Sequence, residues 1–178
     1  TILIPPGHPT REPAPGRILI LPMRDSIDGL IASGNLDAAI AAVGEMLDQK
    51  QQQECWSDAA WAYRKRAQIR FMQNQFEAAI NDAWRALQTA DRAHDSVETA
   101  EAENTLGILL GEEGRLAEAV QHLEHSYLLH RDANSDRLAT VLNNIGNTCL
   151  IMEDAERALD YFERALSAAR EPDSPDGP

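Results

Sequence analysis

The amino-acid sequence predicts an all-α protein, a solenoid of about four helical-hairpin repeats. Four blocks of the chain superimpose without gaps and recur about every 40 residues, a period typical of solenoids. Within each block, apolar residues recur at the spacing of one helical face. Aromatic residues make up only 5% of the chain whereas alanine is frequent, which favours helices packed through small side chains over a sandwich of sheets.

The repeated block is predicted to be the second helix of each hairpin. In the first copy, Ile40, Val43 and Leu47 follow one another at steps of three and four, and later copies keep this pattern. One alanine coincides in all copies, at steps of 40, 40 and 39 residues: Ala39, Ala79, Ala119 and Ala158. The superimposed blocks are 34–47, 74–87, 114–127 and 153–166.

A second helical pattern precedes each block, as in ETAEAENTLGILLGEEG of the third copy. The turn between the two helices carries Gly34, Asn74, Gly114 or Glu153. Glycine and asparagine tolerate the left-handed backbone that ends a helix, while Glu153 suits it less well. Each unit is therefore predicted to be a helical hairpin. The expected repeats are about 24–52, 56–92, 97–132 and 136–170.

Two copies depart from the pattern. The first has a short first helix around RDSIDGLIAS, as expected of a truncated cap. The second carries Arg66 and Arg70 where later copies have apolar residues, although Trp56, Tyr63 and Phe71 still give it an apolar face.

The two ends of the chain are not predicted to belong to the array. Residues 1–23 hold six of the nine prolines, which excludes a long helix. Their apolar pieces TILIP and RILILP predict an extended arm that packs on the solenoid or pairs with another chain. Residues 171–178 have the composition of a disordered tail or linker.

No polar capping helix follows the last repeat, so Leu159, Phe162 and Leu166 are expected to be partly exposed. Such an end predicts either continuation into another domain or self-association there.

The repeated features resemble those of tetratricopeptide repeats over about residues 24–170. The first helix carries a small residue (Ala67, Gly107 and Gly146), and the second helix carries an alanine. In the turn between them, a small residue is followed two positions later by an aromatic residue or leucine. The resemblance implies a right-handed α-α superhelix. The period is longer than the usual 34 residues, as in kinesin light chains, Leu-Gly-Asn repeat proteins and many bacterial signalling proteins.

Composition excludes several classes of function. A net charge of −13 argues against a nucleic-acid partner. Cys55 and Cys149 lack metal-ligand spacing and fit free thiols in a reducing, cytoplasmic compartment. No apolar run approaches the length of a membrane span. The first residues resemble no signal peptide and lack a starting methionine, so we expect a fragment of a longer protein.

The sequence predicts no enzyme and no cofactor, because it contains neither a phosphate-binding glycine loop nor a nucleophile motif. Glu118, His122 and His125, with His130 beyond, form one cluster with helical spacing. We interpret it as solvent-exposed, since the apolar stripe of the same helix faces elsewhere. No metal is predicted there, and adventitious zinc or nickel binding is the alternative.

The basic stretch WAYRKRAQIRF places Arg66 and Arg70 on one side of a helix and Arg64 with Gln68 on another. These arginines are predicted to pair with acidic residues of the neighbouring repeats. The alternative is contact with a carboxylate or acidic peptide, which guanidinium groups bind in bidentate fashion.

The resemblance implies a concave groove lined by one face of each first helix. Asn104 and Asn143 take equivalent places in successive units, and in peptide-binding relatives such asparagines bond the backbone of an extended ligand. An asparagine amide suits this role because it both donates and accepts, although solvation of an exposed face is the alternative. The residues carried over as candidate ligand contacts are Trp61, Arg64, Gln68, Phe71, Asn104, Ile108, Thr140, Asn143, Asn147 and Leu150.

The segment LNNIGN, residues 142–147, concentrates poor helix formers within a predicted helix. In register with the other copies, Gly146 falls where the paired helices approach closely. Asn143 and Asn147 are predicted to face the groove.

Together these features predict a non-catalytic module that binds a peptide or protein segment. One alternative is the sensory or regulatory region of a larger bacterial signalling protein with a kinase, cyclase or transcription output. Another is a homo-oligomeric scaffold assembled through the N-terminal arm or the last helix.

Overall fold

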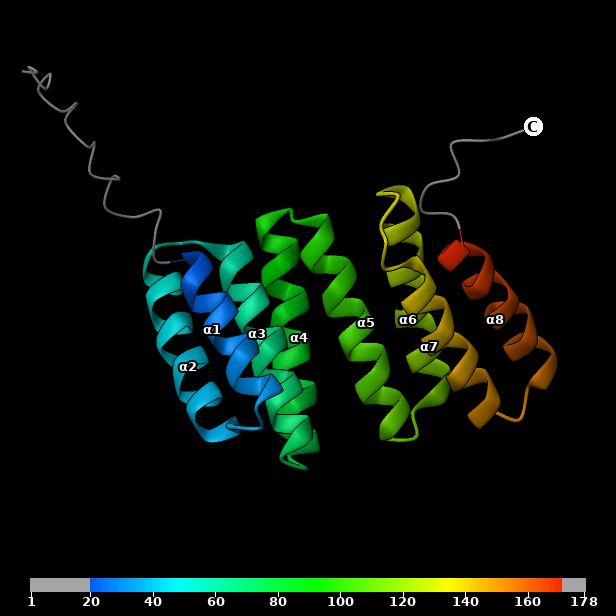
Figure 1. Cartoon of the computed structure of the whole chain (residues 1–178), viewed down its shortest axis with the longest axis horizontal. Coiled ribbons are helices and arrows are strands. Elements are labelled where there is room, and N and C mark those ends of the chain that lie inside the picture. Colours follow the sequence, from blue (N-terminus) through cyan, green and yellow to red (C-terminus); the bar gives the residue numbers. More distant parts are fainter. Residues whose placement is uncertain (1–19, 171–178) are drawn as a thin grey trace, which may run out of the picture.

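The computed structural model describes residues 20–170 of the chain, and this range folds into eight helices and no strand. The helices lie side by side in one elongated array (Figure 1). The all-α solenoid of four hairpins predicted from the sequence is confirmed. The helices are α1 (Ile20–Ala32), α2 (Leu36–Gln52), α3 (Trp56–Met72), α4 (Phe76–Ala93), α5 (Ser96–Glu112), α6 (Leu116–Asp132), α7 (Leu138–Ile151) and α8 (Ala155–Arg170).

The first helix begins earlier than expected. α1 starts at Ile20, inside the stretch assigned to the N-terminal arm, and Pro22 lies in its first turn. Proline is tolerated there because the first N–H groups of a helix have no intrahelical acceptor. α1 has 13 residues, against 17 in α3 and in α5. The rest of the predicted arm and the tail 171–178 lie outside the described residues.

Each helix packs on its neighbours in sequence, most extensively within the pairs α3–α4, α5–α6 and α7–α8. The first helices of successive hairpins also touch, α3 with α5 and α5 with α7. Residues of α3 and α5, and of α5 and α7, therefore lie next to one another although about 40 positions separate them in the sequence.

All seven turns between the described helices end the preceding helix in the same way. Each contains one residue with positive φ, and the next residue donates its N–H to a carbonyl five positions back, at 2.8–3.1 Å. This is the hydrogen bond of a Schellman motif. The left-handed residues are Gly34, Glu54, Asn74, His94, Gly114, Asn134 and Glu153. Glu153 thus takes the left-handed backbone that the sequence argued against, at a cost of roughly 1–2 kcal/mol for a residue with a Cβ.

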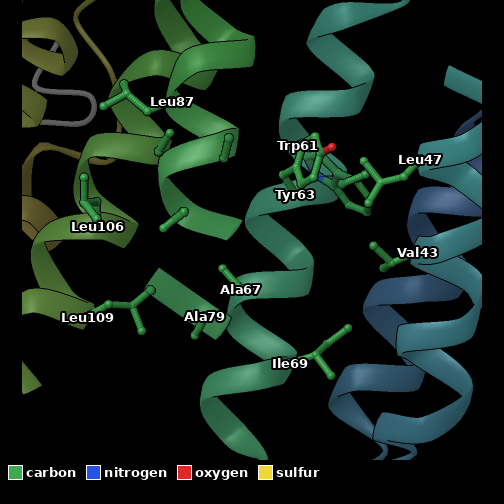
Figure 2. Close-up of a cluster of buried hydrophobic side chains, with 14 of the residues drawn as sticks. Val43, Leu47, Trp61, Tyr63, Ala67, Ile69, Ala79, Leu87, Leu106 and Leu109 are labelled. Atoms are coloured by element: carbon green, nitrogen blue, oxygen red, sulfur yellow. The ribbon is translucent and has the colours of Figure 1, made fainter. Parts of the chain in front are cut away.

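One continuous hydrophobic core runs from α1 to α6, and Figure 2 shows part of it. It contains Val43 and Leu47 of α2, Ile69 of α3, and Leu106 and Leu109 of α5. A smaller cluster joins Leu123 of α6 to Val141, Ile145 and Cys149 of α7 and Ala158 of α8. The core is therefore assembled between neighbouring helices along the array rather than around a single centre.

Two glycines of the first helices lie in close contact with the second helix of their hairpin. A Cβ added to Gly107 would lie 2.6 Å from Cγ of Leu123, and one added to Gly146 would lie 2.6 Å from Cε1 of Phe162. Both distances are too short for carbon atoms in contact. The packing role predicted for Gly146 is confirmed, and Gly107 has the same role one repeat earlier.

Candidate binding site

A pocket of about 410 Å³ lies between α3 and α5, where two successive first helices meet. Five of the ten candidate ligand contacts line it: Arg64, Gln68 and Phe71 from α3, and Asn104 and Ile108 from α5. We call this site the α3–α5 pocket. Its remaining lining residues are Met72, Glu101, Thr105, Leu109 and Arg137.

One end of the α3–α5 pocket is apolar. Phe71 is held there by Phe76, whose ring meets it edge to face with 5.6 Å between centroids. Met72 and Ile108 are exposed at the surface, while Leu109 is buried beneath. A ligand that covers these apolar side chains removes them from water, which favours binding by about 25 cal/mol per Å² of apolar area buried.

The other end of the pocket carries a charge network centred on Glu101. Its carboxylate lies 3.6 Å from Nη1 of Arg64 and 2.9 Å from Nε of Arg137. Arg64 also donates to Glu98, at 3.2 and 3.3 Å. Burial raises the pKa of Glu98 above its ordinary value even though Arg64 opposes the shift. Because Arg64 is bound by two carboxylates of the next repeat, the predicted ion pairing is confirmed for this arginine.

The other two arginines of the basic stretch pair within their own hairpin. Asp82 of α4 is buried, and it accepts two hydrogen bonds from Arg66, at 2.7 and 2.8 Å. Nη1 of Arg70 lies 2.8 Å from the same carboxylate. The hydrogen bonds from Arg66 raise the pKa of its own guanidinium. The prediction of a partner in a neighbouring repeat was wrong for these two residues, because Asp82 faces back across the hairpin.

Asn104 sits in the middle of the α3–α5 pocket and is only 6% exposed. Its Oδ1 accepts a hydrogen bond of 2.9 Å from Nδ2 of Asn144, which reaches across from α7. Within residues 20–170, the Nδ2 group of Asn104 donates no hydrogen bond, so it remains available to a ligand. The sequence did not identify Asn144 as the residue that fixes this amide.

Asn143 differs from its counterpart Asn104 because it is exposed. With Thr140 it lines a second pocket, of about 450 Å³, between α7 and α8 at the end of the array. The remaining lining residues there are Ala139, Phe162, Ala165 and Leu166. Asn147 and Leu150 are exposed on α7 and line neither pocket. The structure therefore divides the candidate contacts of α7 from those of α3 and α5.

Trp61 does not line an open groove, which corrects the prediction made from its register. Its side chain is only 5% exposed and belongs to the core. The guanidinium carbon of Arg24 lies 4.7 Å from the ring centroid, and Nζ of Lys65 lies 5.4 Å from it. Cation–π contacts with these two basic groups therefore help to shield the indole ring from solvent.

Two of the three histidines of α6 are less exposed than predicted, since His122 is half-buried and His130 is buried, whereas His125 is exposed as expected. Nδ1 of His122 and Nδ1 of His125 lie 2.6 and 2.7 Å from the two oxygens of Glu103, a buried residue that the sequence did not single out. Burial alone would raise the pKa of Glu103, but hydrogen bonds from the two histidines leave it below its ordinary value. His130 is also buried, because α6 packs against α5 and α7.

Glu118 takes no part in this cluster and pairs with Arg115 at 2.6 Å. Within residues 20–170, no three His, Cys, Asp or Glu side chains are grouped as a metal ion would need. None of the helices in the same range has the length and hydrophobicity of a membrane span.

Comparison with known proteins gives a consistent picture of the fold. A family model of the tetratricopeptide repeat matches residues 58–128 and 98–171. No curated protein matches the chain by sequence.

Among solved structures, the apo form of RapI is similar with a TM-score of 0.77 and 14% identity, over 87% of this chain and 44% of that chain. The chain thus spans less than half of the RapI structure. BtubC (BKLC) from P. vanneervenii gives a TM-score of 0.74 and 18% identity, over 96% of this chain and 71% of that chain. A putative kinesin light chain from Podospora anserina gives 0.71 and 10%, over 89% and 79%. At these identities the likeness is one of fold.

Proposed function

This chain belongs to the tetratricopeptide repeat family, and from that premise we propose that it binds a peptide or protein segment of a partner in the α3–α5 pocket. The family fold is a protein-interaction module in general and typically a non-catalytic scaffold. One observation carries the proposal: five of the ten residues that the family resemblance implied as ligand contacts, on two different repeats, line one pocket.

The apolar end of the pocket suits one large apolar side chain of the ligand. Met72 and Ile108 lie exposed at its surface, and Phe71 is fixed by its contact with Phe76. Covering these groups removes apolar surface from water without requiring the core to rearrange, which favours binding.

The middle of the pocket suits the backbone of an extended ligand. The Nδ2 group of Asn104 is the donor offered to a ligand carbonyl, and Asn144 holds the amide in place through the Oδ1 atom. An amide whose orientation is already fixed loses little side-chain entropy on binding. Gln68 and Thr105 line the same part of the pocket and add donor and acceptor groups.

The charged end of the pocket argues against recognition of an acidic terminus. Arg64 and Arg137 face the pocket, but Glu98 and Glu101 already bind them. A ligand carboxylate would have to displace a partly buried carboxylate from Arg64, and that exchange gains little. We therefore propose that the ligand is an internal segment with an apolar side chain rather than a C-terminal carboxylate.

Selection from a displayed library of random peptides tests the proposal. Peptides selected on the wild-type chain are expected to carry a large apolar residue and to lose at least about tenfold in affinity for Ile108→Asp. Val97→Asp is the matched control, because Val97 is an exposed apolar residue of the same helix outside the pocket. Failure to enrich any peptide, or equal binding to wild type and both variants, would contradict the proposal.

A further inference from the structure

The end of the array formed by the last hairpin presents an apolar surface, separate from the α3–α5 pocket. Leu159 and Leu166 of α8 are 59% and 52% exposed, and Phe162 lies half-buried between them. The pocket between α7 and α8 continues this surface. We call it the end face and define it by Ala139, Thr140, Asn143, Leu159, Phe162, Ala165 and Leu166.

The same stripe of side chains is buried in the preceding hairpin. Val120 and Leu123 of α6 occupy the positions of Leu159 and Phe162, and they are 7% and 0% exposed. α7 packs on α6 and shares a hydrophobic cluster with Leu123. Since only the position in the array differs, the end face has the composition of a helix-packing interface that no helix within residues 20–170 covers.

At the opposite end of the array, the side chains described from Met23 onward do not match this surface. The described side chains that α1 exposes include Asp25, Ser26 and Asp28. Within residues 23–52, no large apolar side chain is exposed. A head-to-tail contact on these described residues would therefore place Leu159 and Leu166 against polar side chains. A tail-to-tail contact places apolar surface on apolar surface and closes as a two-fold dimer.

We propose that the end face binds the end face of a second copy, with the two α8 helices antiparallel and Phe162 near the two-fold axis. The outward stripe of α8 follows steps of four, three, four and three, as the seam of a coiled coil does. It consists of Ala155, Leu159, Phe162, Leu166 and Ala169. Its order of small, large, large, large and small is the same from either end. An antiparallel copy therefore sets large side chains against large ones and small against small.

One charged residue of α8 allows this arrangement to be distinguished from other dimers. Glu163 is exposed beside Phe162, so a two-fold axis near Phe162 brings it close to Glu163 of the second copy. Like charges at such a position weaken association. The proposal therefore requires that Glu163→Gln strengthen the dimer, whereas a contact elsewhere on the molecule would leave the variant unchanged.

Analytical ultracentrifugation of the full chain over a range of concentrations tests the proposal. The wild type is expected to shift from one chain to two, and Leu159→Glu with Leu166→Glu to associate at least about tenfold more weakly. Both side chains are exposed, so the circular dichroism and melting temperature of the monomer should not change. Leu128→Glu is the matched control, since Leu128 is an exposed leucine of α6 outside the end face.

Cross-linking distinguishes the orientation. In a Cys55→Ser background, Glu163→Cys is expected to form a disulfide between two copies, while the buried Cys149 stays reduced. A wild type that remains a single chain overturns the proposal, as does open-ended growth with concentration or a dimer that survives the double Leu→Glu change. The α3–α5 pocket lies on other helices, so peptide binding and dimerisation can fail independently.

Discussion

The middle of the array and its last hairpin are built from the same repeat, yet equivalent residues behave differently in the two. Asn104 is buried and accepts a hydrogen bond from Asn144 of α7, the first helix of the next hairpin, while Asn143 in the same register is exposed. Leu123 is covered by α7, and its counterpart Phe162 is only half-buried at the end face. The repeat pattern thus determines which way a side chain faces. What covers that side chain is determined by the repeat that follows.

The largest expected effect on stability comes from breaking a buried ion pair in the middle of the array. A half-exposed ion pair near the end of the array provides the comparison. Asp82→Asn leaves Arg66 and Arg70 without a full counter-charge, and we expect a loss of about 3–5 kcal/mol in unfolding free energy. Glu124→Gln removes the negative charge that Tyr161 and Arg157 contact, at a half-exposed site, although the amide oxygen can still accept from Tyr161. We expect this change to cost about 1 kcal/mol or less.

Urea unfolding followed by circular dichroism measures both variants. Equal losses for Asp82→Asn and Glu124→Gln would show that position in the array does not decide the strength of these contacts.

A smaller effect is expected from adding a Cβ at the two packing glycines. At Gly107 the added atom meets Leu123 and also the carbonyl oxygen of Ala119, at 3.0 Å, and neither can move away easily. We expect Gly107→Ala to lose about 1–3 kcal/mol. At Gly146 the obstacle is the ring of Phe162, which is half-buried at the end face and can turn aside.

We therefore expect Gly146→Ala to change the unfolding free energy little, because the higher helix propensity of alanine stabilises the helix by about 1 kcal/mol relative to glycine. Melting temperatures of the two variants measure the difference. If Gly146→Ala is the more damaging change, the end of the array is packed as firmly as the middle.

The smallest effect is a dependence on pH that belongs to the middle of the array. The pKa of Glu103 is held below the ordinary 4.5 by His122 and His125, so its folded form keeps the charge to lower pH than its unfolded form does. The stabilisation is therefore present above about pH 4.5 and is lost as the pH falls through the folded pKa. The difference in unfolding free energy between wild type and Glu103→Gln should shrink over that acid range. A difference that stays constant from pH 6 to pH 3 would contradict this.

The sequence predicts the hairpins well because their signals are local. Steps of three and four in four aligned copies identify each second helix, and Gly107 and Gly146 mark the close contacts. The candidate site is predicted less completely. The partner of Asn104 is a residue 40 positions away, at Asn144 rather than at the aligned Asn143. Asp82 and Glu103 resemble solvated carboxylates in sequence, because nothing local shows that a neighbouring helix covers them.

The shared geometry of the turns has a consequence for how this chain can change in length. Turns inside a hairpin and turns between hairpins close with the same hydrogen bond, so this bond does not distinguish a first helix from a second. The packing of the side chains makes that distinction. Excision or duplication of one repeat length, such as residues 75–114 with α4 and α5, joins two equivalent turns and keeps every other helix in its role. Loss of a single helix and turn would exchange the roles of all later helices, so lengths that differ by whole hairpins are the ones this architecture permits.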